Sequence, residues 1–132
     1  MEDSLWPKID FKAEENALSV LRKQADALKN LSEEVLEGDV TITEAYDQYS
    51  GELVLVYQLF LVAPQLGNNR FKLIAVGQRK DPFPVDVQDK VNNSETVRAK
   101  DLADFKKIIS DILQTDKVIE LLKNLYSQSK QV

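Results

Sequence analysis

The sequence predicts a single domain of the α+β class, in which a long helix precedes an antiparallel sheet and two short helices follow it. Three observations predict this order. Apolar residues recur every three or four positions over residues 11–36, alternate with period two over residues 40–88, and return to the helical period after residue 101. The chain has 132 residues, the usual length of one domain.

We divide the chain into an extended arm over residues 1–10, the α+β domain over residues 11–127 and a flexible tail over residues 128–132. The pair Trp6-Pro7 disfavours helical backbone at the start, because the residue before a proline avoids the α region. We expect Trp6 to anchor the arm on the domain, as aromatic residues in such arms commonly do.

The helix predicted over residues 11–36 has an apolar stripe and a charged opposite side. Asp10 is its expected N-cap and Gly38 the expected stop signal, because these residue types favour the two ends of a helix. At this length the helix is long enough to cross a sheet.

The domain is organised around a hairpin of two apolar runs, residues 53–63 and 71–77, with a polar turn between them. In the first run both alternating sets of side chains are apolar, which is typical of a strand that is covered on both faces. We therefore expect the long helix to cover one face of the sheet. The C-terminal helices or a second subunit would cover the other face.

Two further strands are predicted beside the hairpin. Residues 40–46 alternate as a half-buried strand does, and residues 83–88 do the same. Pro84 cannot donate a hydrogen bond to a ladder, so it places its strand at an edge of the sheet. The result is an antiparallel four-stranded meander, and residues 96–99 leave open a fifth strand.

The two short helices that follow are nearly continuous. Asp101 is the expected N-cap of the first helix, and Thr115 or Asp116 caps the second. We expect the break between the helices at Gln114 and Thr115.

Composition excludes several kinds of chemistry. The chain has no cysteine and no histidine, so it lacks cysteine and Ser-His-Asp nucleophilic machinery and the soft ligands of zinc. Asp81, Asp86 and Asp89 lie close in sequence, but residue 86 differs in strand parity from the other two, so the three do not converge by spacing alone. We expect no catalytic residue, no cofactor and no metal site, and hence no enzyme. A carboxylate- or metal-dependent hydrolase is the most distant alternative.

The charge distribution and the apolar runs bear on location and partners. Residues 1–50 hold 12 acidic against 5 basic residues, a net of −7, within a total of −5. Such a surface disfavours nucleic acid and anionic membranes as partners. The N-terminus has no apolar signal core, and the run 53–63 is too short to span a membrane as a helix. We expect a soluble, cytoplasmic protein.

An acidic cluster closes the predicted long helix. Glu33, Glu34, Glu37 and Asp39 stand where negative charge opposes the helix dipole, and a local cost of this kind can mark a binding surface. The leading hypothesis is a small non-catalytic protein–protein interaction module, such as a regulator or immunity-type protein, that binds a basic partner through these four residues. The alternative is a small-ligand-binding domain with a pocket between the sheet and the helices.

The C-terminal helices also suggest self-association. Their apolar stripes contain adjacent pairs and are wider than one contact surface needs. Pairing two copies would remove the surplus from water, so the sequence predicts a homodimer. The residues concerned are Ile109, Leu113, Leu121 and Leu122. The competing interpretation is that the wide stripes fill the core of a monomer.

Overall fold

The computed structural model describes residues 4–132, so the first three residues of the predicted arm lie outside the description. The α+β class and the chain order of helix, strands and two helices are confirmed. The helices are α1 (Ala17–Leu31), α2 (Leu102–Leu113) and α3 (Asp116–Lys130). The strands are β1 (Glu37–Tyr46), β2 (Leu53–Ala63), β3 (Asn69–Gln78), β4 (Val85–Asp89) and β5 (Val97–Ala99). A short 3-10 turn, η1 (Pro64–Leu66), follows β2.

The sheet is a five-stranded antiparallel meander in which the strands stand in chain order, β1 to β5. The fifth strand that the sequence left open is therefore present. The expectation that Pro84 marks an edge strand is wrong, because β4 lies between β3 and β5. Pro84 avoids the ladder by standing just before Val85, the first residue of the strand.

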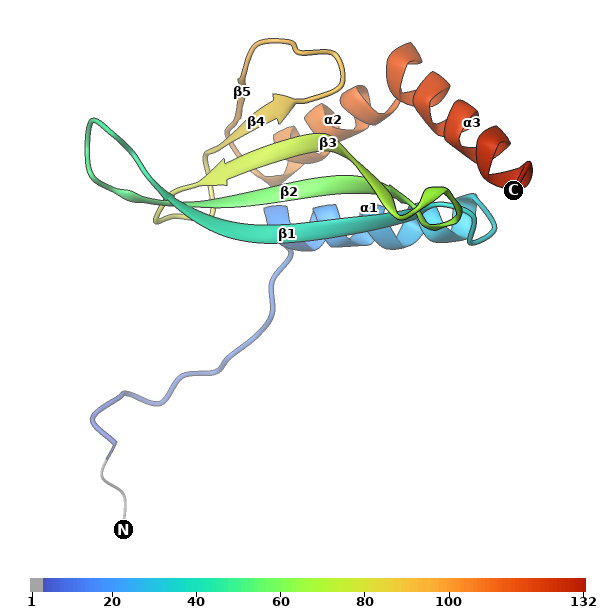
Figure 1. Ribbon diagram of the computed structural model, residues 1–132. Coiled ribbons are helices and arrows are strands. Elements are labelled where there is room, and N and C mark those ends of the chain that lie inside the picture. Colours follow the sequence, from blue (N-terminus) through green and yellow to red (C-terminus); the bar gives the residue numbers. More distant parts are fainter. Residues whose placement is uncertain (1–3) are drawn as a thin grey trace.

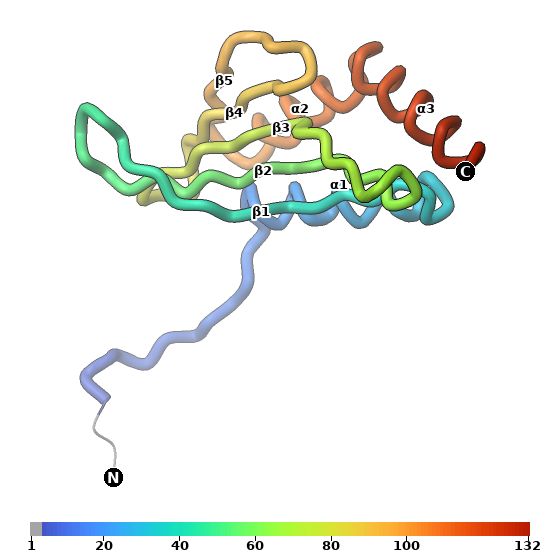
Figure 2. Tube along the Cα trace, in the orientation of Figure 1, coloured from blue at the N-terminus to red at the C-terminus, as the bar shows by residue number. Residues whose placement is uncertain are grey.

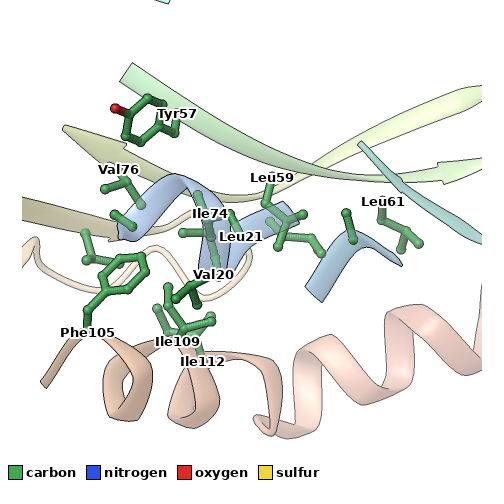
Figure 3. Close-up of a cluster of buried hydrophobic side chains, with 14 of the residues drawn as sticks. Val20, Leu21, Tyr57, Leu59, Leu61, Ile74, Val76, Phe105, Ile109 and Ile112 are labelled. Atoms are coloured by element: carbon green, nitrogen blue, oxygen red, sulfur yellow. The ribbon is translucent and has the colours of Figure 1, made fainter. Parts of the chain in front are cut away.

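All three helices pack on the same face of the sheet, and in Figure 1 α1 and α2 lie partly behind the strands. The cluster of buried side chains in Figure 3 joins β2 and β3 to α1 and α2. Phe105 of α2 and Leu61 of β2 are fully buried there. The expectation that the C-terminal helices cover the other face of the hairpin is wrong, since they share the face that α1 covers. Cover of that face by a second subunit stays a prediction. Within residues 4–132, no helix covers the opposite face, which we call the open face.

The first helix is shorter than predicted at both ends. It begins after Asn16, whose side chain accepts a hydrogen bond from the Ser19 backbone N–H, while the Ser19 hydroxyl accepts one from the Asn16 N–H. This reciprocal pair is a capping box, and it starts the helix six residues after the expected N-cap, Asp10. Glu33 and Glu34, with φ of 53° and 67°, turn the chain out of the helix well before Gly38.

Helix α1 closely approaches the sheet at Gly38 of β1. A Cβ atom added to this glycine would lie 2.4 Å from the Cα and 2.7 Å from the Cβ of Ala25. Two small residues therefore let a helix and a strand approach backbone to backbone. Gly38 belongs to this contact and to β1, rather than to the end of the helix.

The N-terminal arm continues to residue 16 and leaves the domain at the start of α1 (Figure 2). The expectation that Trp6 docks on the domain is wrong, because this side chain is 81% exposed. At the other end of the chain, Asp101 caps α2 as predicted by accepting a hydrogen bond from the Asp104 N–H at 2.8 Å. The break at Gln114 and Thr115 is confirmed, and α3 then continues to Lys130, past the start of the expected tail at residue 128.

Candidate functional site

An apolar groove of about 970 Å³ runs between α1 on one side and α2 with α3 on the other. Its floor is the helix-covered face of the sheet, where Leu59 of β2 and Leu73 of β3 are exposed by only 3% each. The walls are mostly apolar side chains from the three helices: Val20, Leu28, Ile109, Leu113, Val118 and Leu122. The groove exists because α1 and α2 rest on different strands, with the middle of the sheet left between them.

Three charged residues stand at the rim of the groove: Glu15, Lys23 and Lys106. The Glu15 carboxylate contacts both lysines. Glu15, at the base of the arm, accepts a hydrogen bond from the Lys106 ammonium of α2 at 2.7 Å and one from the Lys23 ammonium of α1 at 3.2 Å. Each lysine contacts a different oxygen of the carboxylate. Glu15 therefore ties together the two helices that form opposite walls of the groove.

The same contacts set the charge of the rim. The hydrogen bond from Lys106, followed by that from Lys23, lowers the pKa of Glu15 below its ordinary value. The carboxylate is thus ionised at neutral pH. The groove carries two positive charges and one negative charge on its lining, and its other polar lining groups are neutral amides and a hydroxyl.

A smaller hollow of about 260 Å³ continues the groove toward the end of α1. It shares Leu28, Leu31 and Leu122 with the larger one, and Tyr126 of α3 lies beyond them. Leu31 is 80% exposed where it lines this smaller hollow. The apolar surface therefore extends along most of α1.

Two of the four predicted partner-binding acids have basic partners within the domain. Asp39 accepts a hydrogen bond from Arg70 at 2.6 Å, and Glu37 lies 4.0 Å from the Lys29 ammonium. Glu33 and Glu34 occupy the exposed turn after α1. Two of the four charges are thus already paired within the domain.

The predicted self-association residues are divided between the core and the groove. Ile109 is buried in the core and also lines the groove wall. Leu113 and Leu122 line the groove, and Leu121 is half-buried against the core. The wide stripe of the C-terminal helices therefore faces both the sheet and the groove, and the homodimer stays a prediction.

The three carboxylates near β4 take separate structural roles. Buried Asp89 accepts hydrogen bonds from the backbone N–H groups of Val91 and Asn92, and Asp86 pairs with Arg98 at 3.3 Å. Asp81 is exposed in the turn before β4. Over residues 4–132 no cluster of three acidic residues is placed to hold a metal ion. In the same range, no helix is both long and apolar enough to cross a membrane.

Sequence reasoning missed all three charged residues of the rim. In the sequence, Lys106 resembles any solvated lysine on the polar side of a helix. Glu15 lies inside the helix predicted over residues 11–36. The two lie 91 positions apart in the sequence, so no local pattern could have paired them.

Comparison with known proteins found no matching family model, no matching curated protein and no matching solved structure.

Proposed function

We propose that this protein is a ligand-binding domain that takes an elongated apolar small molecule into the groove between α1 and the C-terminal helices. The observation that carries the proposal is the groove itself, an apolar channel with a volume of about 970 Å³. Natural small-molecule sites occupy about 300–1,000 Å³, are mostly apolar and have a few polar groups that fix orientation. The groove has this composition, with its charged groups confined to the rim.

Burial of an apolar ligand here is favourable because the floor and walls are already fixed by packing in the core. Leu59 and Leu73 belong to the central strands, and Val20 and Val118 are fixed on helices that pack against those strands. A ligand would therefore remove apolar surface from water at about 25 cal/mol per Å² without first ordering the walls.

The hypothesis of an acidic interaction module for a basic partner stays a prediction. The pairing of Asp39 with Arg70 and the proximity of Glu37 to Lys29 give it less support than the groove gives to ligand binding. Its distinguishing feature is that a basic protein partner would bind without competing with apolar ligands.

A neutral fluorescent probe tests the proposal directly. We expect N-phenyl-1-naphthylamine to bind saturably with one molecule per chain, and dodecanol to displace it. Ala27→Trp places a large ring in the groove and should weaken binding about tenfold or more. Ala103→Trp is the matched control, because this alanine is exposed on α2 outside the groove.

Both tryptophan variants should unfold at temperatures close to that of the wild type. The proposal fails if the probe binds without saturation, or if both variants bind the probe as the wild type does.

A further inference from the structure

We infer that the ligand of the groove is a long-chain carboxylic acid, whose carboxylate takes the place of Glu15 between Lys23 and Lys106. This inference rests on the proposed function and adds the head group to it. It follows from the geometry of the rim, where a carboxylate already lies between two ammonium groups above an apolar channel.

The charge of the groove favours an anionic ligand. The rim carries two lysines against one glutamate, and no other charged side chain lines the larger groove. An apolar channel whose charged end is net positive is complementary to a molecule with one anionic end and one apolar end. A neutral ligand would make no use of the two ammonium groups.

The geometry of the two ammonium groups matches a carboxylate. The Glu15 carboxylate offers one oxygen to Lys106 at 2.7 Å and the other to Lys23 at 3.2 Å. Its contacts show that two ammonium groups on opposite walls can be bridged by one planar two-oxygen group. A carboxylic acid ligand has the same group, and its chain would extend from this point over Leu59 and Leu73.

Glu15 can be displaced from the two lysines. It precedes the N-cap of α1, and the described residues before it form an exposed extended arm. Both lysines are also about half exposed or more. The ion pairs that hold Glu15 are therefore weak, as exposed ion pairs generally are. A competing carboxylate that is anchored by its buried chain can displace Glu15.

The channel runs along α1, with the charged rim toward one end. Lys23 and Leu31 stand eight residues apart on α1, so the two ends are separated by about 12 Å along the helix axis. The charged rim is at the Lys23 end and the exposed leucine is at the other. A single-chain ligand would thus lie along α1 with its head group near the arm.

The test compares dodecanoate with dodecanol, which share the chain and differ in the head group, both below the concentration at which they aggregate. We expect the wild type to prefer dodecanoate by about tenfold, because charge-assisted hydrogen bonds at a half-exposed site contribute modestly. The double variant Lys23→Met/Lys106→Met should bind the two molecules about equally.

Glu15→Gln supplies the sharper measurement. It removes the internal competitor, so the affinity for dodecanoate should rise severalfold while the affinity for dodecanol stays as in the wild type. Glu14→Gln is the matched control, since this neighbouring acid does not line the groove, and it should change neither affinity.

The outcomes separate the two proposals. Equal binding of the two molecules by the wild type overturns the carboxylate inference and leaves the proposed function standing. An unchanged affinity of Glu15→Gln for dodecanoate overturns the displacement of Glu15. Absence of binding by both molecules and by the neutral probe overturns the proposed function itself.

Discussion

The two faces of the sheet are built from the same strands, but their apolar side chains are shielded from water in different ways. On the helix-covered face, Tyr57, Leu59 and Leu61 of β2 are buried by three helices. On the open face, Val56 and Phe60 of the same strand are half-buried without any helix over them.

Neighbouring strands supply the cover on the open face. The Arg70 guanidinium lies 4.5 Å from the centre of the Phe60 ring and also pairs with Asp39, so one side chain spans three strands. Long charged side chains shield apolar ones with their aliphatic stems while their heads stay in water. Side chains of the neighbouring strands therefore cover part of the apolar run on the open face.

The largest expected difference between the faces comes from one substitution made on each. Val76→Asn places an amide in the core, where Val76 is fully buried, and should lower the free energy of unfolding by about 4 kcal/mol. Val56→Asn puts the same amide on the open face, within reach of water, and should cost about 1 kcal/mol. Urea denaturation measures both, and losses of similar size would contradict the contrast.

The second comparison uses two glycines. An alanine at Gly38 would overlap the backbone of Ala25, so Gly38→Ala should destabilise the protein by about 1–3 kcal/mol. At Gly77 the added Cβ would meet only a Val54 methyl carbon, at 3.5 Å, on the open face. Gly77→Ala should be neutral or slightly stabilising, because alanine loses less chain entropy on folding. Thermal unfolding of both variants checks the prediction, and a loss at Gly77 as large as at Gly38 would refute it.

A smaller effect is expected for the contact between Phe60 and Arg70. In a double-mutant cycle with Phe60→Leu and Arg70→Met, we expect a coupling energy of about 0.5–1 kcal/mol, the usual strength of an exposed cation–π pair. Urea denaturation of the four proteins in the cycle gives this value. Strictly additive losses would show that Arg70 shields the ring without attracting it.

The smallest effect concerns the turn between β1 and β2. Hydrogen bonds from the Tyr49 N–H, from Arg79 and from the Ser50 N–H lower the pKa of Asp47 below its ordinary value of 3.8. Because the pKa is lower in the folded state, ionised Asp47 stabilises the fold above pH 3.8, and this stabilisation is lost as the pH falls through the folded-state value. Asp47→Asn should thus be less stable than the wild type at neutral pH, and the gap should close in acid. A gap that is constant with pH would exclude this origin.

Local sequence patterns were sufficient for most of the fold. The hairpin, the cap at Asp101 and the break at Gln114 were predictable because turn residues, caps and periodicity act over a few positions. The start of α1 was not, because the apolar spacing before Asn16 suits more than one structure. The signal that could have placed it is the capping pair Asn16 and Ser19.

The candidate site was only partly predictable. A pocket between the sheet and the helices was one of the two alternatives, but no local pattern specified that α1 and the C-terminal helices share one face. The rim depends on that choice, since Glu15 and Lys106 meet only when both helices lie on the same side. Apolar residues of the C-terminal helices that line the groove were recognised as part of a wide stripe. Their place in a groove was not predicted.

The meander has a consequence for how the protein folds. Every strand pairs with the strand next to it in the chain, so the sheet forms through short loops that close quickly. The rim pair of Glu15 and Lys106 instead closes a loop across 91 positions. We therefore expect the sheet to assemble early in folding and the groove to be completed late, so that changes at the rim alter the rate of unfolding much more than the rate of folding.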